Sequence, residues 1–248
     1  MEAPKRFRVI ACEILYRELC LCAAKSKNIV DLTFLPKGLH DMGAAKMQKT
    51  LQEEIDKTQW DKYDAVLLGY GLCNNGTAGL RAKIPLVLPR AHDCITLLLG
   101  SGARYREIFG QNPGTFYKSP GWIEREIDFH DNPESTTSQL GMNQTYLEYV
   151  EKFGEENAKF LMETLGGWTA NYSRLVYIDT GLGNRPFYES DAKRAAEESG
   201  WELETVPGDV SLLEALTGGA WEESAFLVVP PGEKVAAVYG QKIVESQK

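Results

Sequence analysis

The chain has 248 residues, of which 43% are hydrophobic and 25% charged, as is usual for a globular protein. Its formal net charge of −8 argues against a protein that binds nucleic acid by neutralising phosphates. No apolar run approaches the roughly 20 residues of a membrane span, and the charged N-terminus lacks the apolar core of a signal peptide. We therefore expect a cytoplasmic protein with no membrane or nucleic-acid partner. In that reducing compartment, the five cysteines are expected as thiols or metal ligands.

The first 110 residues alternate between short apolar runs and amphipathic segments. Strands are expected at residues 7–14, 30–35, 65–68 and 86–88, because each run is bounded by Gly, Pro or polar residues. Helices are expected at residues 16–25, 44–58 and 77–83, and again from residue 95. This alternation predicts an α/β fold, with a parallel sheet flanked by helices.

The rest of the chain predicts a second α/β segment. Further strands are expected at 174–178, 201–206 and 225–229, with helices at 190–199 and 211–216. Residues 66–74 and 176–184 share one pattern, an apolar run followed by Gly-Leu-x-Asn, which is either a duplication or a coincidence between two glycine-rich turns. We expect two similar Rossmann-like halves around a shared cleft, at 1–110 and 165–248. Residues 111–164 would connect them through a polar loop at 128–143 and a long helix.

Sulfur and nitrogen ligands follow three of the expected strands. Cys12 lies at the end of the first strand, Cys73 follows the third, and His92 and Cys94 follow the fourth. Ligands bind outside the carboxyl ends of parallel strands, so these side chains can converge if the three strands are neighbours in the sheet. Zinc prefers thiolate and imidazole ligands, and thiolates also suit iron–sulfur clusters and copper(I). The pattern predicts a metal site held by Cys12, Cys73, His92 and Cys94.

Two other interpretations of these cysteines stay open. Free cysteines are often buried and simply pack in a core. Alternatively, Cys73 or Cys94 is a reactive thiolate, since each precedes an expected helix near Arg90 and His92. A small anionic substrate or cofactor would also need polar contacts, for which the candidates are Gly71, Asn74, Asn75, Arg90 and Asp179. The glycine pattern does not match a dinucleotide fingerprint or a P-loop, so neither NAD nor ATP is expected.

Several stretches also resemble a known family. They are Ala-Cys at 11–12, Phe-Leu-Pro-x-Gly-Leu-His at 34–40, Leu-Leu-Gly-Tyr-Gly-Leu-Cys-x-Asn-Gly at 67–76 and Pro-Arg-Ala-His-Asp-Cys-Ile at 89–95. Through them, residues 8–127 resemble the family called domain of unknown function 1638, and the resemblance is weaker after about residue 165. It includes the positions of all four expected metal ligands.

The resemblance implies a setting in anaerobic one-carbon metabolism, beside corrinoid-dependent methyltransferases. In that setting the expected function is a zinc-binding protein, either a methyl-transfer enzyme that uses a zinc thiolate or its accessory protein. The alternative is a non-catalytic module that binds a corrinoid or a partner methyltransferase and holds no metal of its own.

Overall fold

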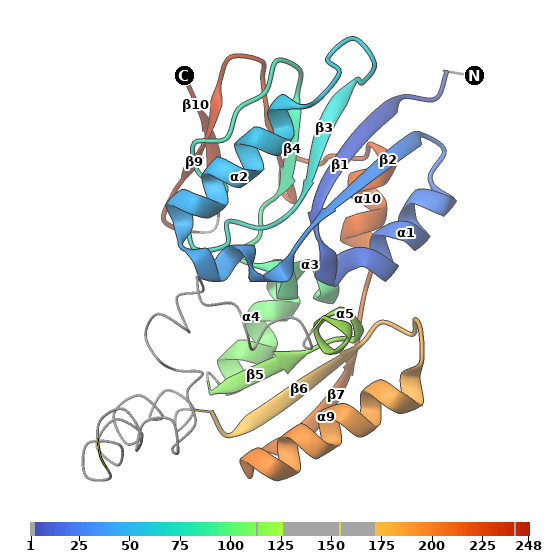
Figure 1. Ribbon diagram of the computed structural model, residues 1–248, viewed down its shortest axis with the longest axis vertical. Helices are drawn as coiled ribbons and strands as arrows, with labels where there is room; N and C mark the ends of the chain where they lie inside the picture. The colour runs from blue at the N-terminus through green and yellow to red at the C-terminus, as the bar shows by residue number, and fades with distance from the viewer. Residues whose placement is uncertain (1–2, 113, 126–153, 155–171, 241) are drawn as a thin grey trace.

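The computed structural model describes residues 3–112, 114–125, 154, 172–240 and 242–248, which form two sheets with flanking helices and a small hairpin (Figure 1). The polar loop expected at 128–143 and the helix expected at 146–165 lie outside these residues. Among the helices that are described, none combines the length and the apolar character needed to cross a membrane.

The larger sheet has five strands in the order β2-β1-β3-β4-β8. Its first four strands are parallel, namely β1 (Arg6–Cys12), β2 (Ile29–Leu35), β3 (Ala65–Gly69) and β4 (Leu86–Pro89). Every residue of β3 and β4 is buried, which explains why their sequences are continuous apolar runs without alternation. The edge strand β8 (Phe226–Val229) pairs with β4 in the antiparallel direction. The expectation of an α/β fold with a largely parallel sheet is confirmed.

Helices cover both faces of this sheet. Figure 1 shows α2 (Ala44–Asp56) on one face, while α1 (Tyr16–Lys25) and α10 (Ser211–Gly218) pack together on the other. The inward side of α2 is the apolar stripe that its sequence predicts, formed by Met47, Leu51 and Ile55, all of them buried. With both faces covered, the carboxyl ends of the parallel strands are the place where a ligand binds in such a fold.

A smaller parallel sheet has the order β5-β6-β7. Its strands are β5 (Thr115–Lys118), β6 (Arg174–Asp179) and β7 (Glu202–Pro207), and α9 (Arg185–Ser199) packs against β6 and β7. Three short helices lie between the two sheets (Figure 1), namely α3 (Cys94–Leu99), α4 (Gly102–Gln111) and α5 (Pro120–Glu124). Two 3-10 turns, η1 (Glu13–Leu15) and η2 (Lys37–Met42), follow β1 and β2.

The C-terminal segments pack against the larger sheet. β9 (Lys234–Ala237) and β10 (Val244–Gln247) form an antiparallel hairpin, and β10 contacts β8. Arg90, just after β4, anchors this region, because its guanidinium donates to the carbonyl oxygens of Glu223 at 2.8 Å, Lys242 at 3.0 Å and Val244. The expected domain boundary at residue 165 stays a prediction. Strand pairing assigns β8 to the larger sheet.

The segment after β3 differs from the expected helix at 77–83. Residues 73–79 instead form a series of turns. Cys73, Asn74 and Asn75 have φ angles of 46°, 53° and 67°, which lie in the left-handed region. A residue that has a Cβ is strained in this region, although Asn adopts it more readily than most residues. The helical expectation was wrong because the Asn-Asn-Gly turn extends into the residues that favour a helix.

Candidate functional site

A cavity of about 470 Å³ lies at the carboxyl edge of the larger sheet. Its walls come mainly from the segments that follow β1, β3 and β4, and Trp122 of α5 closes the opposite side. This is the edge at which a parallel sheet binds ligands. It is also the edge at which the sequence predicts a site.

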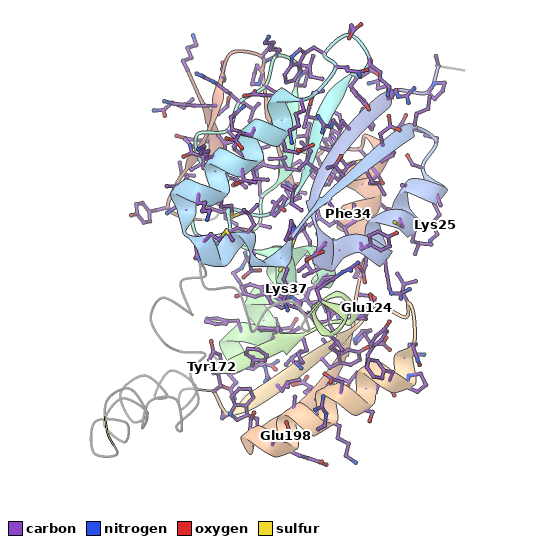
Figure 2. The ribbon with its side chains drawn as sticks, viewed as in Figure 1. Lys25, Phe34, Lys37, Glu124, Tyr172 and Glu198 are labelled. Carbon is purple, nitrogen blue, oxygen red and sulfur yellow. The ribbon has the colours of Figure 1, made fainter. Side chains whose placement is uncertain are left out.

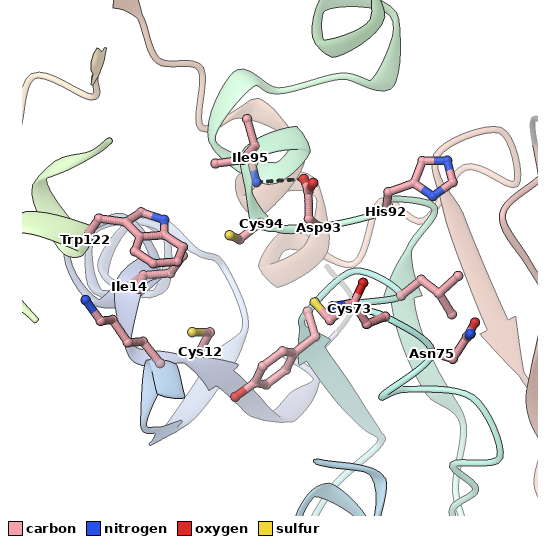
Figure 3. Close-up of a pocket in the computed structure, with 13 residues that line it drawn as sticks. Cys12, Ile14, Cys73, Asn75, His92, Asp93, Cys94, Ile95 and Trp122 are labelled. Carbon is pink, nitrogen blue, oxygen red and sulfur yellow. Dashed lines mark hydrogen bonds between the residues drawn. The ribbon is translucent and has the colours of Figure 1, made fainter. Parts of the chain in front are cut away.

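Three cysteines bring sulfur to this cavity. Cys12 is the last residue of β1, Cys73 begins the turn after β3, and Cys94 is the first residue of α3. All three line the cavity, and Figure 3 shows their side chains directed toward a common space. Because β3 lies between β1 and β4, the strand order is what makes residues so distant in the chain meet.

Backbone hydrogen bonds fix the two loops that carry Cys73 and Cys94. The N–H of Leu72 donates to Ala91 O, and the N–H of Cys73 donates to His92 O, both at 2.8 Å. The loops approach so closely that a Cβ on Gly71 would lie 2.7 Å from Ala91 O. Only glycine fits such a backbone contact.

Asp93 fixes the direction in which α3 leaves the cavity. Its carboxylate Oδ1 accepts hydrogen bonds from the N–H groups of Ile95 at 3.1 Å and Thr96 at 3.3 Å. This is an N-cap, which satisfies donors at the start of the helix. The cap therefore orients Cys94, the residue that follows it.

The surroundings of Cys73 and Cys94 favour their protonated forms. Burial raises the pKa of the Cys73 thiol to about 12, and the nearby Cys12 adds to the effect. Burial also raises the pKa of Cys94 well above its ordinary value, with further contributions from Asp93, Cys12 and Cys73. A reactive thiolate needs the opposite shift, so the geometry disfavours that interpretation. A bound metal ion would have to displace these protons.

His92 occupies a different position from the cysteines. It is exposed at the rim of the cavity, and its ring points away from the three sulfur atoms in Figure 3. The structure thus brings three of the four expected metal ligands together. As the side chains stand, the described residues include no group of three Cys, His, Asp or Glu that could hold a metal ion.

The expected substrate contacts separate into two groups. Asn74 and Asn75 line the cavity, and Gly71 lies behind them at the contact between the loops. Arg90 and Asp179 do not line it. Arg90 binds the C-terminal carbonyls described above, whereas Asp179 pairs with Arg185 and accepts the N–H of Gly181 at 2.9 Å.

Besides Asp93, two polar residues line the cavity that were not expected there from the sequence. Lys37 is only 5% exposed, and its ammonium lies 5.1 Å from the centre of the Trp122 ring. Figure 2 labels Lys37 just below the larger sheet, where the chain leaves β2. Tyr70 follows β3 directly and is 4% exposed. Its place between Gly69 and Gly71, at a strand end, was a usable signal, because such positions face the crevice.

Fold and cavity together define an α/β protein with a cavity, lined by three cysteines, at the strand ends of a parallel sheet. A comparison with protein families matches residues 34–217 to the family described as "Protein of unknown function (DUF1638)". The chain belongs to this family, as its sequence motifs indicate. The matched segment includes Cys73, His92 and Cys94 and begins after Cys12. Searches of curated proteins and of solved structures returned no match.

Proposed function

We propose that this protein binds a metal ion, zinc in the first instance, through Cys12, Cys73 and Cys94. One observation carries the proposal, which is that sulfur atoms from three separate elements face one cavity. Packing alone would not require three thiols to meet at a cavity that opens at the ligand-binding edge of the sheet.

The ligand set suits zinc chemistry. Zinc takes thiolate sulfur readily, and catalytic zinc sites keep one position for water or substrate beside three protein ligands. His92 is the residue that would complete a closed, four-ligand site, by turning its ring inward. Otherwise the fourth position belongs to a small molecule, and the bound metal would activate it as a Lewis acid.

The other cavity residues have roles that do not depend on the identity of the metal. Ile14, Ile95 and Trp122 line the cavity with apolar surface and limit the access of water. Asn74 and Asn75, at the rim, would contact a small anionic substrate or cofactor. The apolar lining lowers the local dielectric constant, and this strengthens each polar contact that such a ligand makes.

We further propose a setting in cytoplasmic one-carbon metabolism linked to corrinoids, as a methyl-transfer enzyme or its accessory protein. This part rests on the family resemblance, with a corrinoid or a methyltransferase as partner. The two sheets would be similar halves facing a shared cleft. The position of Trp122 supports this, because α5 follows β5 of the smaller sheet and lines a cavity formed by the larger one.

Metal analysis of the purified protein tests the proposal. We expect one zinc per chain in the wild type and loss of that zinc in Cys73→Ala. Cys22→Ala is the matched control, because Cys22 is a buried thiol in α1, with a pKa raised to about 12 by burial, and does not line the cavity. Protein made in zinc-supplemented medium without stoichiometric metal would contradict the proposal, as would equal metal loss in both variants.

A further inference from the structure

The cavity contains a buried hydroxyl that has nothing to bind in the described part of the chain. Tyr70 is 4% exposed and lines the cavity, and its Oη has no hydrogen-bond partner among the described residues. Most buried polar groups in proteins are hydrogen-bonded, and an orphan commonly marks a missing ligand, ion or water. Tyr70 therefore needs an explanation.

The neighbours of this hydroxyl are the three thiols. Burial raises the pKa of Tyr70 well above its ordinary value, and the nearby Cys12, Cys73, Glu13 and Cys94 raise it further. The phenol thus lies within electrostatic reach of all three sulfur atoms. Because Tyr70 lines the same cavity as Cys12, Cys73 and Cys94, its O–H group is a donor available to an anionic atom held there.

A second tyrosine provides a comparison within the same protein. Tyr177 on β6 is fully buried and also has no partner for its hydroxyl among the residues described. Its pKa is raised by burial and then by Asp179 and Glu189, and no thiol contributes. Tyr177 does not line the cavity. The two residues therefore share burial and an orphan hydroxyl but differ in whether thiols are nearby.

We infer that Tyr70 is a positioning residue of the metal centre, and that its hydroxyl donates a hydrogen bond to an anionic atom bound to the metal. This inference rests on the proposed function. The acceptor is either the sulfur of a metal-bound cysteine or the donor atom of a small anionic ligand, such as a thiolate, that completes the coordination. Both are anionic acceptors that metal binding would supply, since a metal-bound thiol is deprotonated.

The inference predicts opposite effects in the metal-free and metal-bound states. In the free protein the Tyr70 hydroxyl is a buried group without a protein partner, so removing it should not destabilise the fold. In the metal-loaded protein the same hydroxyl donates a hydrogen bond to an anionic atom bound to the metal, so removing it should weaken metal binding. Residues that hold metal ligands in place typically contribute about 10–100-fold to metal affinity.

Cobalt(II) provides the measurement, because thiolate–cobalt bonds absorb in the near ultraviolet and report both affinity and ligand set. Wild type, Tyr70→Phe and the control Tyr177→Phe are titrated with Co²⁺ and Zn²⁺ against a competing chelator. Each is also melted without metal. We expect Tyr70→Phe to melt at or above the wild-type temperature without metal and to bind both ions about 10–100-fold more weakly. Tyr177→Phe should bind them as the wild type does.

A second arm identifies the acceptor. Cobalt-loaded protein is titrated with 2-mercaptoethanol, and the shift of the charge-transfer band gives its affinity. If Tyr70→Phe keeps wild-type metal affinity but binds this thiol about tenfold more weakly, the acceptor is the small ligand and the inference stands. Unchanged affinity for both metal and thiol would overturn it. A wild type that binds no metal would instead refute the proposed function, and this inference with it.

Discussion

Replacing Gly71 by alanine tests how the two cysteine loops are held together. An added Cβ would lie 2.7 Å from both Ala91 O and Asp93 N and 2.9 Å from His92 C. Ordinary contacts begin near 3.4 Å, and all three atoms belong to the backbone, so the loops must separate by several tenths of an ångström. Overpacking of this kind costs about 1–3 kcal/mol.

Separation also weakens the two hydrogen bonds that join the loops, from the N–H groups of Leu72 and Cys73, each about 1 kcal/mol. We therefore expect Gly71→Ala to lose about 3–5 kcal/mol of unfolding free energy, measured by urea denaturation. Zinc affinity should fall as well, because Cys73 and Cys94 move apart.

Gly110→Ala is the matched control. A Cβ there meets nothing within 4 Å, and the residue lies in α4. Alanine should stabilise this helix by about 0.5–1 kcal/mol and leave zinc affinity unchanged. If the unfolding free energy of Gly71→Ala lies within 1 kcal/mol of the wild-type value, the two loops do not approach as closely as described. The close approach then does not position the thiols.

Three further predictions concern other parts of the structure. Burial raises the pKa of Glu18, which accepts a hydrogen bond from Thr180 at 2.7 Å. The unfolding free energy of the wild type should therefore fall as pH rises above 4.5, the ordinary pKa, until the pH exceeds the raised pKa of the folded protein. Over the same range, the stability of Glu18→Gln relative to the wild type should rise. Arg90→Ala should lose about 2–3 kcal/mol without changing zinc affinity, because Arg90 binds carbonyls outside the cavity. Cys73→Ser and Cys73→Ala should be equally damaging with zinc, whereas a merely packed thiol would make Ser the worse of the two.

Each of these has a distinct contradictory outcome. A stability difference between Glu18→Gln and wild type that stays flat from pH 4 to 8 would show that the carboxyl is not the titrating group. A loss of zinc in Arg90→Ala, without matching loss of stability, would return Arg90 to the site. For Cys73, Ser should remain worse than Ala with zinc present if the thiol only packs, and chelation should not alter the wild-type melting temperature.

The shared edge of the cysteines was predictable from the sequence, whereas their convergence also needed the strand order, in which β3 lies between β1 and β4. Continuous apolar runs identified β3 and β4 as buried parallel strands, and parallel strands end at the same edge. Residues just beyond those ends, such as Cys73 and Cys94, lie near one another because β3 and β4 are neighbours. No side-chain detail was needed for that step.

Other features depend on contacts that a sequence pattern does not contain. His92 lies two residues before Cys94, a spacing that suggested a shared site, but its ring points away from the sulfur atoms. Its carbonyl oxygen accepts a hydrogen bond from the N–H of Cys73 in the neighbouring loop. Arg90 stands beside the site residues, yet its partners Lys242 and Val244 lie about 150 positions further along the chain. The left-handed run at Cys73 was hidden because two of its three residues are asparagines followed by a segment of helix-forming residues. The ion pair of Asp179 is different, because its partner Arg185 follows only six residues later and could have been predicted from the sequence.

X-ray absorption of the zinc-loaded protein tests the central claim most directly, because it counts the sulfur atoms bound to the metal. The account predicts three sulfur ligands at about 2.3 Å in the wild type. The purified variants Cys12→Ala, Cys73→Ala and Cys94→Ala should lack stoichiometric zinc, and each should show two sulfur ligands only when it is reloaded with excess zinc. Cys22→Ala should keep three sulfur ligands without reloading. A zinc shell made only of nitrogen and oxygen, or a sulfur count that none of the three variants lowers, would contradict it.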